Sequence, residues 1–208
     1  MDRTEVIDTP ITRLPELGAG AGCVALTFDD GPQPPWTGQL LDILERTETP
    51  ATFFVLGSQI PGNEPLLRRM VRQGCAVEVH AWEHTRMTEQ TAKELRADID
   101  RTRDLIGTVT GREPRYLRPP EGHVSREVLE DIRAAGLTPV FWSVHAADWT
   151  RPGTAAIEER ITAGLDDGAV VLLHDAGGDR SQTIAAVPPI IGAVRSRGLR
   201  PVSLSDLP

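Results

Sequence analysis

Short apolar segments alternate with stretches of helical pattern along most of this chain, and this alternation limits the folds it can adopt. The strand-like segments lie near residues 23–28, 51–55, 76–80, 115–118, 138–143, 169–173 and 200–204. The helical patterns lie near residues 37–47, 64–73, 88–108, 125–135, 154–166 and 182–197. Such alternation predicts an α/β fold with a parallel sheet whose strands are covered by helices. The number of βα units favours a barrel, with an open sheet as the alternative.

The predicted helices carry suitable residues at their ends. Thr88 and Ser125 are expected N-caps, because short polar side chains there accept hydrogen bonds from free backbone N–H groups. Thr91 stands where a capping box starting at Thr88 needs Glu or Gln, so we expect no full capping box. Glycines follow three of the expected last turns, at Gly74, Gly136 and Gly198. We expect residues 1–21 to be an irregular lead-in and residues 22–208 to form one domain.

The charge of the chain bears on its partners. The formal net charge is −8 at pH 7, and no stripe of basic residues is visible, which disfavours nucleic acid as a partner. No uninterrupted apolar run is long enough to cross a bilayer, so we expect no membrane association. Cys23 and Cys75 fall at or just before predicted strands, which favours buried free thiols over a disulfide.

The first residues suggest where the protein acts. They contain neither the basic region nor the apolar region of a signal peptide, which predicts a cytoplasmic protein. If an export signal precedes these residues in the natural protein, we expect a secreted protein instead. A monomer is the default expectation for its oligomeric state.

Chemically reactive residues collect where the predicted strands end. The apolar run before Asp29 and Asp30 stops at these two carboxylates, and Gly31-Pro32 then turns the chain. Adjacent carboxylates repel each other, so the pair indicates a bound cation or a proton-transfer role, with a solvated turn as the alternative. Later strands end at His80-Ala-Trp-Glu-His84, Arg118-Pro-Pro-Glu-Gly122, Asp148-Trp149 and Leu172-Leu-His174-Asp175. Because the carboxyl ends of parallel strands meet at one end of the fold, we expect these segments to form one site.

Two histidines in this set have the spacing of metal ligands. His80 and His84 can converge at a strand end, and Asp30 can add a third ligand. Two His and one carboxylate leave an open coordination position, as catalytic zinc requires. Glu83 lies between the histidines and is expected to point away. Each residue has an ordinary alternative as well: Asp148 could cap a turn, Arg118 could form a surface ion pair, and His174 could be a hydrogen-bonded core residue.

Together, these segments resemble the five motifs of the polysaccharide deacetylases (NodB-homology domain, carbohydrate esterase family 4). The matching segments are Thr27-Phe-Asp-Asp-Gly-Pro32, His80-x3-His84, Arg118-Pro-Pro-x-Gly122, Asp148-Trp149 and Leu172-x-His174. The resemblance extends from about residue 22 to 207, and it makes residues 22–208 a NodB-like catalytic domain. It implies a distorted (β/α) barrel of about seven parallel strands. It also implies a divalent metal, usually zinc, with cobalt or another divalent ion as alternatives, used to hydrolyse N-acetyl or O-acetyl groups on sugars.

The resemblance implies a role for each matching residue. Asp30, His80 and His84 would hold the metal. Asp29 would be the general base, kept ionised and oriented by Arg118. His174 would be the general acid, with Asp148 orienting it and raising its pKa. The remaining positions would contact the substrate: the backbone N–H of Glu121 would stabilise the oxyanion, and Trp149 and Leu172 would surround the acetyl methyl group. Pro120 would be a further substrate-binding residue.

Three positions depart from the family pattern. Glu121 stands where an aromatic residue is usual, His145 where Asp is usual, and Ala81 where Ser or Thr is usual. Glu121 makes one groove wall acidic, which suits a basic or amino-bearing ligand. Because the reactive residues are all present, we expect these changes to affect substrate choice rather than activity itself.

The sequence therefore predicts a metal-dependent hydrolase that removes N-linked acetyl groups from an acetylamino sugar, which could be an oligosaccharide, a glycan or a small glycoside. The alternatives are an O-acetyl esterase, a non-sugar amide hydrolase, or a catalytically silent sugar-binding module.

Overall fold

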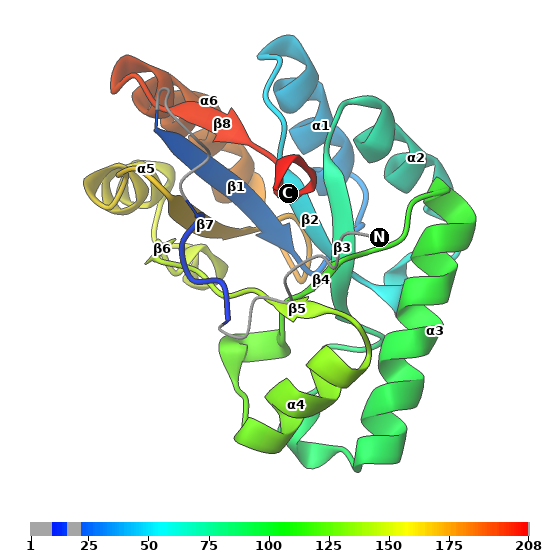
Figure 1. Ribbon diagram of the computed structural model, residues 1–208. Helices are drawn as coiled ribbons and strands as arrows, with labels where there is room; N and C mark the ends of the chain where they lie inside the picture. Colours follow the sequence, from blue (N-terminus) through cyan, green and yellow to red (C-terminus); the bar gives the residue numbers. More distant parts are fainter. Residues whose placement is uncertain (1–9, 16–21, 208) are drawn as a thin grey trace, which may run out of the picture.

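The computed structural model describes residues 10–15 and 22–207, and its centre is an eight-stranded sheet (Figure 1). The strands are β1 (Cys23–Asp29), β2 (Thr52–Leu56), β3 (Ala76–Ala81), β4 (Tyr116–Leu117), β5 (Thr138–Pro139), β6 (Val144–His145), β7 (Ala169–His174) and β8 (Arg200–Val202). They lie in the order β5-β4-β3-β2-β1-β7-β6, with β8 paired to the first half of β1. Every pairing between these strands is parallel.

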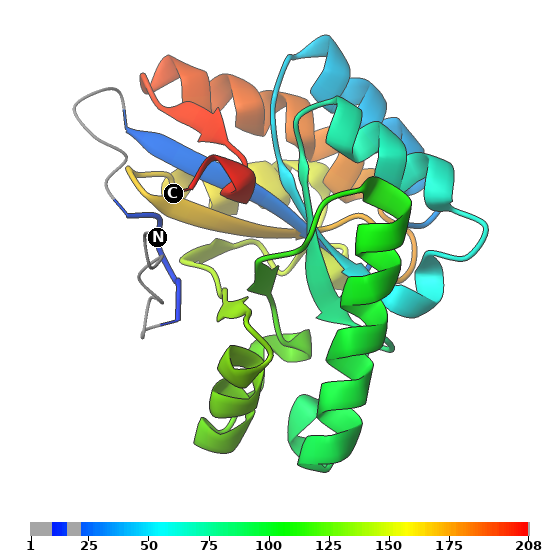
Figure 2. The same cartoon turned by 45° about the vertical axis from the view of Figure 1, so that its right-hand side comes forward.

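Helices cover the outer face of this sheet (Figure 2). They are α1 (Trp36–Arg46), α2 (Glu64–Arg72), α3 (Ala92–Thr110), α4 (Arg126–Ala134), α5 (Thr154–Ala163) and α6 (Ser181–Ser196). Neighbouring helices contact one another in the order α4-α3-α2-α1-α6-α5, which follows the order of the strands beneath them. The predicted α/β fold, a distorted (β/α) barrel formed by a single domain, is confirmed.

The two faces of the strands have different surroundings. On β1, Val24 and Phe28 pack among the residues between the sheet and the helices, whereas Cys23 and Ala25 belong to a smaller cluster inside the barrel. Side chains alternate along a strand, so Asp29 lies on the same inward face as Cys23 and Ala25. A strand buried on both faces thus delivers one carboxylate to the interior at its carboxyl end.

An N-terminal segment fills the space between the two edges of the curved sheet. The Ile11 N–H donates to the Pro139 carbonyl at 2.9 Å, and the Leu14 N–H donates to the Gly168 carbonyl at 2.8 Å. Both Ile11 and Leu14 are buried in the inner cluster. Of the lead-in expected for residues 1–21, residues 1–9 and 16–21 lie outside the described part.

The strand expected over residues 138–143 is divided in two. The Val140 N–H still donates to the Leu117 carbonyl in β4, the Phe141 N–H donates to the Ile11 carbonyl, and the Ser143 N–H donates to the Val170 carbonyl in β7. The chain therefore crosses from one edge of the sheet to the other within these few residues. No periodicity in the sequence shows such an exchange of partners, and the expectation of one strand was wrong.

The start of α3 also differs from expectation. Thr91, not Thr88, is its N-cap, and its side chain accepts the Glu94 N–H while the Glu94 carboxylate accepts the Thr91 N–H. A full capping box is therefore present, one turn later than the position considered from the sequence. The expected N-cap Ser125 is confirmed, because its hydroxyl accepts the Val128 N–H at the start of α4.

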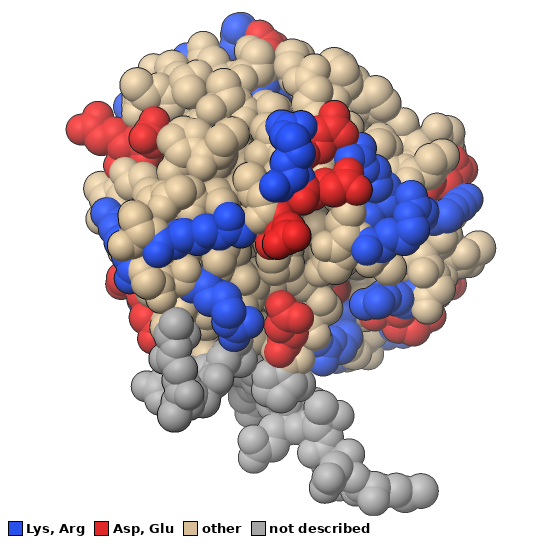
Figure 3. All heavy atoms as spheres, turned by 90° about the horizontal axis from the view of Figure 1, so that it is seen from above, with Lys and Arg blue, Asp and Glu red and all other residues tan. Residues whose placement is uncertain are grey.

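Other expectations concern the thiols and the surface. Cys23 and Cys75 are buried and free, as expected. Among the described residues, no helix has the length and apolar character needed to cross a membrane. On the face shown in Figure 3, basic and acidic side chains are mixed rather than gathered into areas of one sign.

Candidate active site

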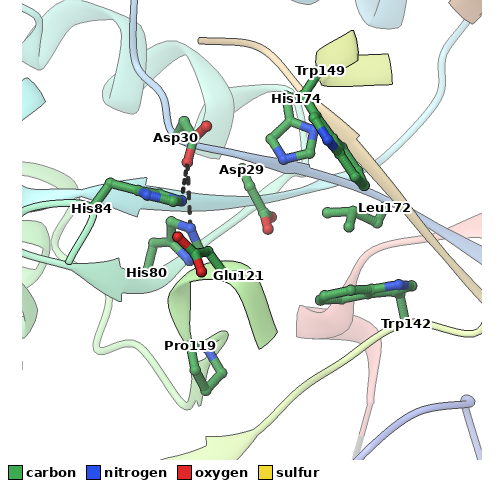
Figure 4. A pocket seen from close by; sticks show the side chains of 10 residues that line it. All are labelled: Asp29, Asp30, His80, His84, Pro119, Glu121, Trp142, Trp149, Leu172 and His174. Atoms are coloured by element: carbon green, nitrogen blue, oxygen red, sulfur yellow. Dashed lines mark ion pairs between the residues drawn. The ribbon is translucent and has the colours of Figure 1, made fainter. Parts of the chain in front are cut away.

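A pocket of about 410 Å³ lies at the carboxyl ends of the strands, within the size range of small-molecule sites. In Figure 4, Asp30, His80, His84 and Glu121 lie on one side of it, and His174, Trp149, Leu172 and Trp142 lie on the other, with Asp29 between them. The residues that line it are Asp29, Asp30, His80, His84, Pro119, Glu121, Trp142, Trp149, Leu172 and His174. The sequence motifs therefore converge on one cavity, as their positions at strand ends predicted.

Asp30, His80 and His84 form a group that could hold a metal ion. Asp30 Oδ1 lies 3.4 Å from His80 Nε2 and 3.5 Å from His84 Nε2. One ligand atom from each residue lies within 4.8 Å of the other two. Asp30 Oδ1 is buried yet accepts no hydrogen bond from another described residue. A buried carboxylate oxygen without a donor, facing two imidazole nitrogens, fits a divalent cation such as zinc.

Neighbouring groups keep Asp30 negatively charged and orient His80 for binding a cation. Burial alone would raise the pKa of Asp30, but the neighbouring histidines, His80 first, lower it to about 2, so this carboxylate stays ionised. His80 Nδ1 lies 2.6 Å from the Arg118 carbonyl, and donation to that oxygen leaves Nε2 free of a proton for a metal. Glu83 is exposed and stands outside the group, as expected.

The turn after β1 depends on the small size of Gly31. A Cβ atom at this position would lie 2.5 Å from Asp175 Oδ2. The Asp175 carboxylate is fully buried and accepts the Thr37 hydroxyl, and burial raises its pKa to about 7. Because the chain turns closely over this side chain, Asp30 is held in a left-handed conformation (φ 77°) that aims it toward the histidines.

Asp29 has a buried cationic partner. Arg118 is fully buried, and its Nη1 donates to Asp29 Oδ1 at 2.8 Å and to the Thr27 hydroxyl at 2.6 Å. Its Nη2 donates to the Phe141 carbonyl at 2.8 Å. Burial lowers the pKa of Arg118 and the charge of Asp29 opposes that shift, so the guanidinium remains protonated. The structure thus excludes a surface ion pair for Arg118 and keeps a cation beside Asp29.

His174 faces the pocket from the end of β7. Its Nδ1 lies 2.9 Å from Asp148 Oδ1, and its backbone N–H donates to Asp148 Oδ2 at 3.0 Å. The Thr183 hydroxyl donates to that second oxygen at 2.9 Å. Burial would lower the pKa of His174, but the hydrogen bond and charge of Asp148 outweigh it and raise the pKa. With Nδ1 donating to a carboxylate, Nε2 is the nitrogen available to the pocket.

Three of the four residues that were predicted to contact the substrate line the pocket. Glu121, Trp149 and Leu172 line the pocket as predicted. Pro120 is buried and does not line it, whereas the preceding Pro119 does. Glu121 follows these prolines in a left-handed conformation, with a φ of 57°.

Trp142 lines the pocket but was not among the predicted site residues. It falls inside the segment 138–143, which was expected to be a regular strand. In the structure this segment crosses the open side of the sheet, and the indole lies in the pocket wall below Leu172 in Figure 4. The signal available in the sequence was its closeness to Asp148 and Trp149 along the chain.

The acidic wall predicted from Glu121 carries a counter-charge. Glu121 Oε2 lies 2.7 Å from Nε of Arg86, which comes from the loop after β3. The hydrogen bond to Arg86 lowers the pKa of Glu121. This part of the wall therefore presents a paired carboxylate rather than an isolated negative charge.

Comparisons with known proteins agree with this geometry. A family model described as polysaccharide deacetylase matches residues 18–140. A peptidoglycan-N-acetylglucosamine deacetylase of Bacillus cereus is 34% identical over 186 residues, covering 88% of this chain and 87% of that protein. A chitooligosaccharide deacetylase of Sinorhizobium fredii is 38% identical over 196 residues, covering 89% and 91%. The structure of peptidoglycan deacetylase PdaC from Bacillus subtilis superposes with a TM-score of 0.82 at 33% identity, covering 90% of each chain.

Proposed function

The chain belongs to the polysaccharide deacetylase family, carbohydrate esterase family 4, and we propose that it removes N-linked acetyl groups from an N-acetylamino-sugar oligosaccharide. Relatives that match nearly its whole length are named for peptidoglycan N-acetylglucosamine and chitooligosaccharide deacetylation. These names agree on an N-acetylated glucosamine unit as the reacting sugar.

One observation carries the proposal. Asp29 and His174 line the same pocket, and they are register partners on the adjacent strands β1 and β7. Asp29 is held by the buried Arg118, and His174 is held by the buried Asp148. Amide hydrolysis needs one group that takes a proton from water and another that gives a proton to the leaving nitrogen. A carboxylate beside a cation and an imidazole beside a carboxylate, both facing one cavity, match that need.

The protein groups account for the proton transfers. Asp29 takes a proton as water adds to the acetyl carbon, and Arg118 Nη1, 2.8 Å from Asp29 Oδ1, orients this carboxylate. The Glu121 backbone N–H donates a hydrogen bond to the developing oxyanion. As the carbon–nitrogen bond breaks, His174 Nε2 gives its proton to the leaving nitrogen, which departs as the free amine of the sugar. Acetate is the other product.

The metal requirement rests on the ligand group already described. Asp30, His80 and His84 would hold one divalent ion, with zinc as the proposed occupant. When bound, such an ion polarises a carbonyl and lowers the pKa of water. Trp142, Trp149 and Leu172 give the opposite wall an apolar surface suited to the acetyl methyl group.

Acetate release tests the proposal. Zinc-loaded protein, chelator-treated protein and Asp29→Asn are each given triacetylchitotriose and an O-acetylated xylo-oligosaccharide. Asp104→Asn is the matched control, because Asp104 is an exposed carboxylate on α3. We expect release from the N-acetylated sugar only when both zinc and Asp29 are present. Release from the O-acetylated sugar alone would make the protein an esterase. Sugar binding without any release would make it a binding module.

A further inference from the structure

His145 lies beside the pocket without lining it. It ends β6 and is the register partner of Leu172 on β7, so its backbone is attached to the sheet. Its ring is stacked on Trp149, with centroids 5.7 Å apart and 11° between the planes. It also meets Trp142 edge-on, at 6.5 Å and 73°. Both tryptophans line the pocket, whereas His145 does not.

The Trp149 side chain is exposed, so few contacts other than ring stacking fix its rotamer. It is 44% exposed, the one large hydrophobic residue in the described part of the chain with this much exposure. It lies in the turn Asp148–Thr150, which is flanked by left-handed conformations at Ala147 (φ 51°) and Arg151 (φ 55°). The hydrogen bonds of Asp148 fix the backbone of this turn but not the indole. An exposed side chain free to change rotamer must be ordered when a ligand binds, which lowers affinity.

The stacked ring also places Trp149 relative to the reacting groups. The indole meets the imidazole of His174 nearly at right angles, at 5.3 Å and 75°. Within residues 10–15 and 22–207, its ring contacts are with His145 and His174. In Figure 4, Trp149 lies beside His174 and reaches toward Leu172, so its position shapes the wall next to the proposed acid.

We propose that His145 is a positioning residue that holds the Trp149 indole in the pocket wall through ring stacking. This inference rests on the proposed function for its kinetic consequences, but the stacking itself does not depend on a substrate. The chemical requirement is a flat ring at position 145. The imidazole protons are not needed, because His145 is absent from the pocket lining and from the hydrogen bonds of His174.

Kinetics with triacetylchitotriose test this role. His145→Ala should raise KM about three- to tenfold, the range expected for loss of one aromatic pair, and should leave kcat within about twofold. His145→Phe retains a ring and should restore KM, whereas His145→Gln retains size and polarity without a ring and should not. In a Trp149→Ala background, His145→Ala should add little, because the two residues would act as one unit.

A second measurement needs no substrate. Acrylamide quenching of tryptophan fluorescence should increase in His145→Ala and return to the wild-type value in His145→Phe. The increase should be absent when Trp149 is replaced by Ala. His123→Ala is the matched control, because His123 is an exposed histidine that hydrogen-bonds Thr88 outside the pocket.

The outcomes are separable. Unchanged quenching in His145→Ala overturns the proposal, whatever the kinetics show. A fall in kcat that Phe does not restore also overturns it, because the imidazole would then act chemically. If the wild-type protein releases no acetate, the proposed function fails, while the quenching comparison still decides whether His145 holds Trp149.

Discussion

Asp29 and His174 are paired in register at the carboxyl ends of the adjacent strands β1 and β7. Their separation is therefore set by the sheet rather than by a loop. Each has a buried partner that carries the opposite charge: Arg118 pairs with Asp29, and Asp148 pairs with the protonated His174. A base and an acid mounted on neighbouring strands need little reorganisation before reaction, which favours catalysis.

Replacing Asp148 should change the pH dependence of the reaction. His174 must be protonated to donate, so kcat should fall as the pH rises through its pKa. Asp148 raises that pKa, and Asp148→Asn should therefore move the fall to lower pH and reduce kcat about ten- to a hundredfold. A kcat–pH profile with triacetylchitotriose measures both effects. Thr183→Val, which removes a hydrogen bond to the same carboxylate without removing charge, should leave the profile in place. An unmoved alkaline limb in Asp148→Asn would exclude His174 as the acid.

The loop between the metal-ligand histidines should depend on α3 for its position. The Trp82 N–H donates to Asp98 Oδ1 at 2.7 Å, and the Arg101 guanidinium lies 3.3 Å from the centre of the Trp82 ring. Asp98→Ala should therefore weaken zinc binding about three- to tenfold by loosening His84. Competition with a chelating dye measures this affinity. Asp104→Ala on the same helix is the control, and equal affinities for the two variants would contradict the prediction.

The ion pair on the pocket rim should influence charged ligands more than stability. Arg86 and Glu121 are both about half exposed, so their pairing contributes little to folding. Arg86→Ala leaves the Glu121 carboxylate unpaired in the pocket wall. We expect chitotriose, whose amines are protonated, to bind about two- to fivefold more tightly, and the gain to disappear in high salt. Triacetylchitotriose should bind as before. Calorimetry with both sugars measures the difference, and Arg126→Ala, which breaks an exposed pair on α4, is the control.

A buried carboxyl far from the pocket should make stability depend on pH. Burial raises the pKa of Glu78 to about 8, although its Oε2 accepts the N–H groups of Arg115 and Tyr116. The folded state thus holds a proton that the unfolded state releases above its ordinary pKa of 4.5. The wild-type protein should lose stability as the pH rises from 4.5 to about 8.

Glu78→Gln cannot release this proton and should escape the loss. Its free energy of unfolding should exceed that of the wild type by roughly 2–4 kcal/mol at pH 9, with the difference shrinking toward zero at pH 4. Urea unfolding at both pH values measures it. Exposed Glu113→Gln is the control, and a constant difference between the variant and the wild type would contradict the prediction.

The reactive residues could be located from the sequence because strand geometry is regular. Asp29, His80 and His174 each follow an apolar run, and alternation places them on the inward face at the same end of parallel strands. The resemblance to the family motifs added roles, which remain predictions until variants are measured. The metal group formed by Asp30 and the two histidines was expected from the same spacing.

Features that depend on irregular backbone could not be predicted. Trp142 enters the pocket because the chain crosses from Leu117 to Val170 there, an exchange of partners that no local pattern encodes. Pro119 rather than Pro120 lines the cavity, in a segment that continues into the left-handed Glu121. Such irregular backbone has no periodic pattern in the sequence from which it could be predicted.

The N-terminal segment that contains Ile11 is connected to the active site through hydrogen bonds. The Ile11 carbonyl accepts the Phe141 N–H, the Phe141 carbonyl accepts Arg118, and Arg118 holds Asp29. The family match starts at residue 18, after Ile11. A chain that began at residue 18 would lack Ile11 and its hydrogen bond to Phe141, so we expect it to hold Arg118 and Asp29 less firmly.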